Sequence, residues 1–127
     1  MKKITCFEDL VAWQKSRVLT KEIYDMTRQG DIKKDHALSS QFQRAAVSMM
    51  ANIAEGFERN RKAEFHQFLS VAKASCAELR SHLYVALDAG YLSEEYFKKL
   101  QSHAVEVGRI LGGLRAAIAK QRDALNA

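Results

Sequence analysis

The sequence contains no proline, and it has only six glycines and two cysteines among 127 residues. Folds built from many short strands or long loops need more turn residues than this. The scarcity of proline and glycine therefore argues against a sandwich or barrel. Cys6 and Cys76 provide neither a disulfide framework nor a metal motif. No apolar stretch approaches the roughly 18 residues of a membrane span, and the N-terminus turns acidic where a signal peptide is apolar. We therefore expect a soluble, cytoplasmic helical protein.

The overall composition is that of one globular domain. Hydrophobic residues make up 47% and charged residues 28% of the chain, which is not the balance of a disordered tail. Twenty Lys and Arg against fifteen Asp and Glu give a net charge of +5. A modest positive balance permits nucleic-acid binding without requiring it. No linker or low-complexity tract suggests a division, so residues 1–127 are expected to form a single domain.

Apolar residues recur at helical spacing in four segments that are separated by short polar breaks. Thr5 and Glu8 fit a capping box at the start of the first segment. A short connection around residues 91–92 makes the last two helices antiparallel neighbours. The pattern predicts an all-α, antiparallel up-down-up-down four-helix bundle. Its expected helices cover residues of about 6–28, 36–58, 61–89 and 94–123.

The second expected helix has one narrow polar stripe on an otherwise apolar surface. The stripe spans about 80° of the helix, and its members are Gln41, Arg44, Ser48, Asn52 and Glu55. A helix this apolar is expected to pack on more than one side, which indicates a subunit interface beyond the bundle core. Three interpretations remain open: a polar network at a subunit contact or around a central opening, a solvated face, or a catalytic site. The apolar surroundings favour the interface.

Residue combinations typical of catalysis or metal binding are missing from the sequence. The four histidines form no short metal-ligand spacing, and the serines have no base at a plausible distance along the chain. Gly108 and Gly112 lie one turn apart within a helix, which predicts a close approach of two helices rather than a phosphate loop. We therefore expect neither an enzymatic activity nor a metal or cofactor.

Basic residues are scattered, with denser groups after the second helix and in the last helix. The candidate nucleic-acid contacts are Arg59, Arg61, Lys62, Arg109, Arg115 and Lys120. For each group, the alternative is an ordinary solvated surface charge. A symmetric oligomer would repeat every patch, so that a small basic patch becomes a belt that phosphates can follow.

The run Leu38–Gly56 resembles the signature of the 23S rRNA intervening-sequence protein family, approximately L-[TS]-x-Q-x-x-R-A-x-x-S-x-x-x-N-I-A-E-G. Further family motifs match at residues 7–13 (F-x-x-L-x-x-W), 64–78 (E-F-x-x-F-L-x-x-A-x-x-S-x-x-E) and 90–92 (G-Y-L). The resemblance covers roughly residues 7–118. The polar stripe consists largely of signature positions.

This resemblance implies a homo-oligomeric bundle, typically a five-fold ring around a central channel. The accessory factor of diversity-generating retroelements, a basic ring thought to hold nucleic acid and a reverse transcriptase, is similar. We therefore expect a non-enzymatic homo-oligomer, a pentamer, that binds RNA or DNA through repeated basic residues and has no membrane partner. The alternative is a scaffold for protein–protein interaction whose positive charge is incidental.

Overall fold

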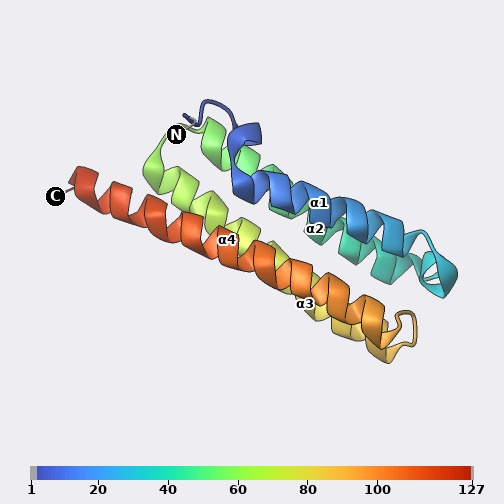
Figure 1. Ribbon diagram of the computed structural model, residues 1–127. Coiled ribbons are helices and arrows are strands. Elements are labelled where there is room, and N and C mark those ends of the chain that lie inside the picture. The colour runs from blue at the N-terminus through green and yellow to red at the C-terminus, as the bar shows by residue number, and fades with distance from the viewer. Residues whose placement is uncertain (1–2, 127) are drawn as a thin grey trace.

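The computed structural model describes residues 3–126 as an antiparallel four-helix bundle without strands in that range (Figure 1). Its elements are η1 (Phe7–Asp9), α1 (Val11–Thr27), η2 (Gly30–Lys34), α2 (His36–Glu58), α3 (Lys62–Asp88) and α4 (Glu94–Asn126). Each long helix packs against two others, α1 and α3 both contacting α2 and α4. The predicted all-α four-helix bundle is confirmed. Within the described residues, no helix has the length and hydropathy that would let it cross a membrane.

The first helix begins later than the sequence pattern predicts. Instead of a continuous helix from residue 6, η1 forms one short turn, Leu10 is extended (φ −74°, ψ 125°), and α1 starts at Val11. Asp9, not Glu8, accepts the capping bonds, from the Thr5 backbone N–H (3.1 Å) and hydroxyl (3.2 Å). The break lets Leu10 enter the core and sets Phe7 against the edge of Trp13. The free energy gained by burying these apolar side chains exceeds what one further helical turn would contribute.

The other helix ends lie close to the expected positions. Asp35 caps α2 by accepting the Leu38 N–H (3.0 Å), and it also accepts the Tyr91 hydroxyl (2.9 Å) from the α3–α4 connection. Asn60 adopts a positive φ of 58° in the α2–α3 turn, so α3 begins at Lys62. α4 continues to Asn126, beyond the predicted end at residue 123. No glycine or proline stands there to stop it.

The apolar surface of α2 is covered mainly by α1 and α3 of the same chain. Four of its residues are completely buried, with an exposed fraction of 0%: Phe42, Ala46, Met49 and Ile53. Val47 remains 47% exposed on the outward face. Two-sided packing of α2 is therefore largely satisfied within one chain, and only a narrow outward face is left for another copy.

Among the glycines, the closest approach of a neighbouring helix lies at Gly56, where α2 meets α3. A Cβ atom on Gly56 would stand 2.6 Å from the Phe68 Cβ, which is closer than two carbon atoms can pack. At Gly108 and Gly112 a Cβ would meet its nearest atoms, on Cys76 and Lys73, at 3.7 and 3.5 Å, which are ordinary contacts. The prediction that two helices approach closely at Gly108 and Gly112 is therefore wrong within this chain. The close approach is instead between α2 and α3, at Gly56.

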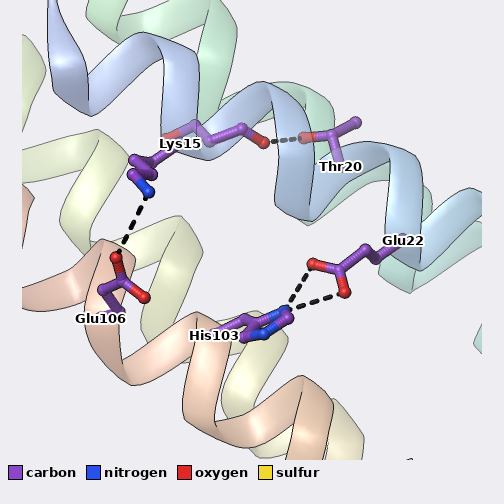
Figure 2. Close-up of polar contacts among 6 residues, drawn as sticks. Lys15, Thr20, Glu22, His103 and Glu106 are labelled. Carbon is purple, nitrogen blue, oxygen red and sulfur yellow. Dashed lines mark hydrogen bonds and ion pairs between the residues drawn. The ribbon is translucent and has the colours of Figure 1, made fainter.

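Two polar contacts join α1 to α4 across the side of the bundle shown in Figure 2. His103 Nδ1 lies 2.7 and 2.8 Å from the two carboxylate oxygens of Glu22. Lys15 Nζ lies 3.7 Å from Glu106 Oε1. The Glu22 side chain is only 20% exposed, whereas both members of the second pair are more than half exposed. The His103–Glu22 contact is therefore the more strongly shielded of the two.

We expect Glu22→Gln to lower the free energy of unfolding by about 1 kcal/mol, because a charge-assisted hydrogen bond becomes a neutral one at a partly shielded position. Lys21→Gln is the matched control, since its pair with Asp25 is largely exposed and contributes at most about 0.5 kcal/mol. Urea unfolding of both variants measures the difference. Equal losses would mean that the α1–α4 contact adds no specific stability.

Candidate nucleic-acid interface

A groove of ≈ 370 Å³ lies on the outer surface between α3 and α4. Small side chains and two glycines form its floor: Cys76, Ala77, Gly108 and Gly112. Three cations stand around it, Lys73 and Arg80 from α3 and Arg109 from α4. Among the described residues, none of these three forms an ion pair with a carboxylate. The groove therefore presents three cations that form no ion pair among the described residues.

Helical spacing explains why these residues meet. Lys73 and Arg80 are seven residues apart on α3, which places them on one face at a separation of about 10 Å along the helix axis. α4 runs antiparallel to α3, and Arg109 lies on the face of α4 that lines the groove beside Lys73 and Arg80. Arg80 is oriented by Gln101, whose Oε1 accepts its Nε–H at 3.1 Å. The three cations therefore stand along the same groove.

The thiol of Cys76 lies in the lining of the groove. Cys76 donates its thiol to the Ala104 carbonyl (3.3 Å), and burial raises the pKa of this thiol above its usual value. A thiol held protonated is a poor nucleophile. In the part of the chain that the structure describes, no three His, Cys, Asp or Glu side chains gather into a potential metal site. A hollow of ≈ 470 Å³ adjoins Arg109, and its lining carries both a cation, Lys98, and a carboxylate, Glu106.

The sequence-predicted nucleic-acid contacts fall into different environments. Arg109 lies in the groove, and Arg115 is half-buried with its Nε–H donated to Ser70 (2.7 Å). Arg59 is already neutralised by Glu55 (3.1 Å) and Glu64 (3.7 Å), and it stacks on a phenylalanine ring. Arg59 is consequently the least available of these cations for phosphate.

The remaining predicted contacts are exposed at one end of the bundle. Arg61 and Lys62 lie where α3 begins, and Lys120 lies near the end of α4, at the same end in Figure 1. None of them pairs with a described carboxylate. Sequence reasoning missed Lys73 and Arg80, which are distant from Arg109 along the chain. Their spacing of seven residues on α3 was the available signal.

The polar stripe of α2 divides into two parts in the folded chain. Ser48 Oγ lies 2.8 Å from Ser75 Oγ on α3, and Asn52 Nδ2 donates to the Ser48 carbonyl (2.8 Å) and hydroxyl (3.1 Å). Ser48 therefore joins α2 to α3 within one chain, and Asn52 supports Ser48 from the next turn of α2. Gln41, Arg44 and Glu55 are exposed. These three are the more exposed members of the stripe, whereas Ser48 and Asn52 are half-buried.

Arg44 borders a shallow groove of ≈ 410 Å³ between α1 and α2. Val47, Ser48 and Tyr24 also line this groove. Arg44 makes no hydrogen bond or ion pair with any described residue, whereas Glu55 is held by Arg59. An arginine beside exposed apolar surface is typical of protein interfaces.

Comparison with known proteins identifies both a family and a fold. The sequence model of one family, described as 23S rRNA-intervening sequence protein, matches residues 8–113. A crystal structure of a protein with unknown function from the S23 ribosomal protein family of Bacteroides thetaiotaomicron is similar, with a TM-score of 0.75 and 22% sequence identity. The similarity covers 83% of this chain and 98% of the other, and it shows a shared fold. No curated protein matches the chain.

Proposed function

Because the chain belongs to the 23S rRNA-intervening sequence protein family, we propose that it is a non-enzymatic homo-oligomer that binds RNA or DNA. The observation that carries the proposal is the α3/α4 groove, where Lys73, Arg80 and Arg109 form no ion pair with a carboxylate among the described residues. Contacts of this kind are made to phosphates, so binding would depend steeply on salt and little on base sequence.

The proposed assembly is a ring of five copies, which repeats the groove around its circumference. The outward face of α2 supports self-association. It carries Val47, 47% exposed, and exposed Ala51 beside the unpaired Arg44. Covering this face would bury its apolar side chains, and Arg44 would need an acceptor on the neighbouring copy. Repeated grooves would add contacts to one nucleic acid strand without any new side chain.

A salt titration with a triple variant tests the groove. We expect the wild-type protein to bind mixed-sequence RNA or DNA at about 50 mM salt, as measured by fluorescence anisotropy. In Lys73→Gln/Arg80→Gln/Arg109→Gln, the slope of log affinity against log salt should fall by about 1 for each lost phosphate contact. The affinity should drop at least about tenfold.

A second triple variant controls for total charge. Arg28→Gln/Lys33→Gln/Lys34→Gln removes the same number of positive charges outside the groove, around η2 at one end of the bundle. Its affinity should stay within about threefold of wild type. Equal losses in both variants would show that diffuse charge binds, not the groove. Absence of binding to every RNA and DNA would overturn the proposal and favour the protein-interaction scaffold.

A further inference from the structure

A second cluster of basic side chains lies between the first turns of α3 and the last turns of α4. Arg122 Nη1 lies 3.4 Å from His66 Nδ1, and Arg115 donates its Nε–H to Ser70 Oγ at 2.7 Å. Ser70 in turn donates its hydroxyl to the His66 carbonyl (3.1 Å). Two guanidinium groups from α4 therefore converge on a single turn of α3.

The contact between Arg122 Nη1 and His66 Nδ1 favours one protonation state of the imidazole. A guanidinium group only donates hydrogen bonds, so His66 Nδ1 must accept. His66 is therefore neutral in this arrangement, with its proton on Nε2. Protonation of Nδ1 would break the contact and would place a third positive charge beside Arg115 and Arg122.

The charges around His66 are unbalanced. Burial, followed by the positive charges of Arg115 and Arg122, lowers the pKa of His66 below its usual value, and only Asp123 acts in the opposite direction. Asp123 is 69% exposed and is itself paired with Arg122 (3.2 Å). Lys62 stands one turn before His66 on α3 and adds another cation. The cluster thus has more positive charge than its own carboxylate can neutralise.

A consequence for the protein without bound anions is a stability that depends on pH. The unfolded chain takes up a proton on His66 near its ordinary pKa of about 6.5, whereas the folded chain resists this proton. The free energy of unfolding should therefore decrease as the pH falls through about 6.5. His66→Gln should reduce this decrease in urea unfolding curves measured without sulfate or phosphate. An unchanged pH profile would contradict the lowered pKa.

We propose that this cluster binds the dianionic phosphate of a phosphate monoester through Arg115 and Arg122, with His66 taking up a proton as the ligand enters. The anion would replace His66 as the acceptor for Arg122, and protonated His66 would donate to the anion in turn. Guanidinium groups suit phosphate because they donate paired hydrogen bonds. This inference does not depend on the α3/α4 groove or on oligomer formation.

Sulfate is the probe, because it stays a dianion across the range in which histidine titrates. We expect it to bind about fivefold or more tightly near pH 6 than near pH 8, and to shift the imidazole NMR signals of His66. Arg115→Gln and Arg122→Gln should each weaken binding at least about tenfold. Arg28→Gln, which removes an exposed arginine from the far end of the bundle, should leave binding unchanged.

His66→Gln separates proton uptake from simple attraction. Glutamine still offers an acceptor to Arg122 but cannot be protonated, so sulfate binding should persist without its pH dependence. Binding by wild type that is equally strong near pH 6 and pH 8 would overturn the proton-coupled site. Equal weakening by Arg28→Gln would also overturn it, because net charge alone would then explain the affinity.

Oligonucleotides with and without a 5′-phosphate identify the source of the phosphate group. If the natural ligand is a nucleic acid end, the phosphorylated form should bind more tightly, and Arg115→Gln should remove the preference. If sulfate binds but the two oligonucleotides bind equally, the site takes a free phosphate monoester. Failure of all oligonucleotide binding, with sulfate still bound at His66, would overturn the proposed function and leave this site standing.

Discussion

Gly56→Ala is expected to destabilise the protein by about 2 kcal/mol, even though alanine favours a helix by about 1 kcal/mol over glycine. The added methyl group would stand 2.6 Å from the Phe68 Cβ and 3.1 Å from the Phe65 Cδ1. The Phe68 Cβ is bonded directly to the α3 backbone, so no change of rotamer moves it aside. α2 and α3 must separate instead, and their buried contacts loosen. Urea unfolding measures the loss.

Gly108→Ala is the matched control with the opposite sign. Its methyl group would meet the Cys76 Sγ at 3.7 Å, an ordinary contact, so the helix gains propensity without strain. We expect a gain of up to about 1 kcal/mol in the free energy of unfolding. If Gly56→Ala were as stable as Gly108→Ala, α2 and α3 would not approach as closely as described. The comparison therefore tests the helix packing directly.

Val47→Glu is expected to dissociate the proposed homo-oligomer into single chains. Val47 is 47% exposed on the outward face of α2, so the isolated chain should tolerate the substitution. In an assembly that covers this face, an unpaired carboxylate would be buried at a cost of about 3–5 kcal/mol. Association should weaken at least about 100-fold. Light scattering across a range of concentrations measures the mass.

The equivalent substitution on another helix shows whether the subunit interface lies specifically on α2. Val85→Glu alters an equally exposed valine, 50% accessible on the outer side of α3. We expect it to leave the mass unchanged, and circular dichroism should show both variants folded. A wild-type protein that runs as a single chain would refute the assembly. Dissociation by Val85→Glu alone would move the interface from α2 to α3.

The helices could be predicted because their apolar residues repeat with the helical period, and α2 has the expected bounds of 36–58. The start of α1 could not be predicted from local signals. Thr5 and Glu8 fit a capping box, but the contact between Phe7 and Trp13 and the burial of Leu10 favour a short turn followed by a break. Packing against distant residues overrode the local pattern.

The candidate site was predicted only in part for the same reason. Arg109 was identified from the sequence, but the groove that gives it a role also needs Lys73 and Arg80 from α3. Arg59 resembled an available cation in the sequence, yet in the structure Glu55 and Glu64 neutralise it. Net charge is a property of composition, whereas the field at a surface depends on which charges the fold pairs.

By itself, the sequence determined the all-α class, the four helices and the family, because helical periodicity and signature residues are encoded over short distances. Only the tertiary structure decided at which glycine two helices come closest, which arginines find a partner and which serines join helices. Gly56, Arg115 and Ser48 each depend on a neighbour at least 12 residues away in the chain, Phe68, Ser70 and Ser75 respectively. Such contacts depend on how helices cross, and no local pattern specifies that crossing.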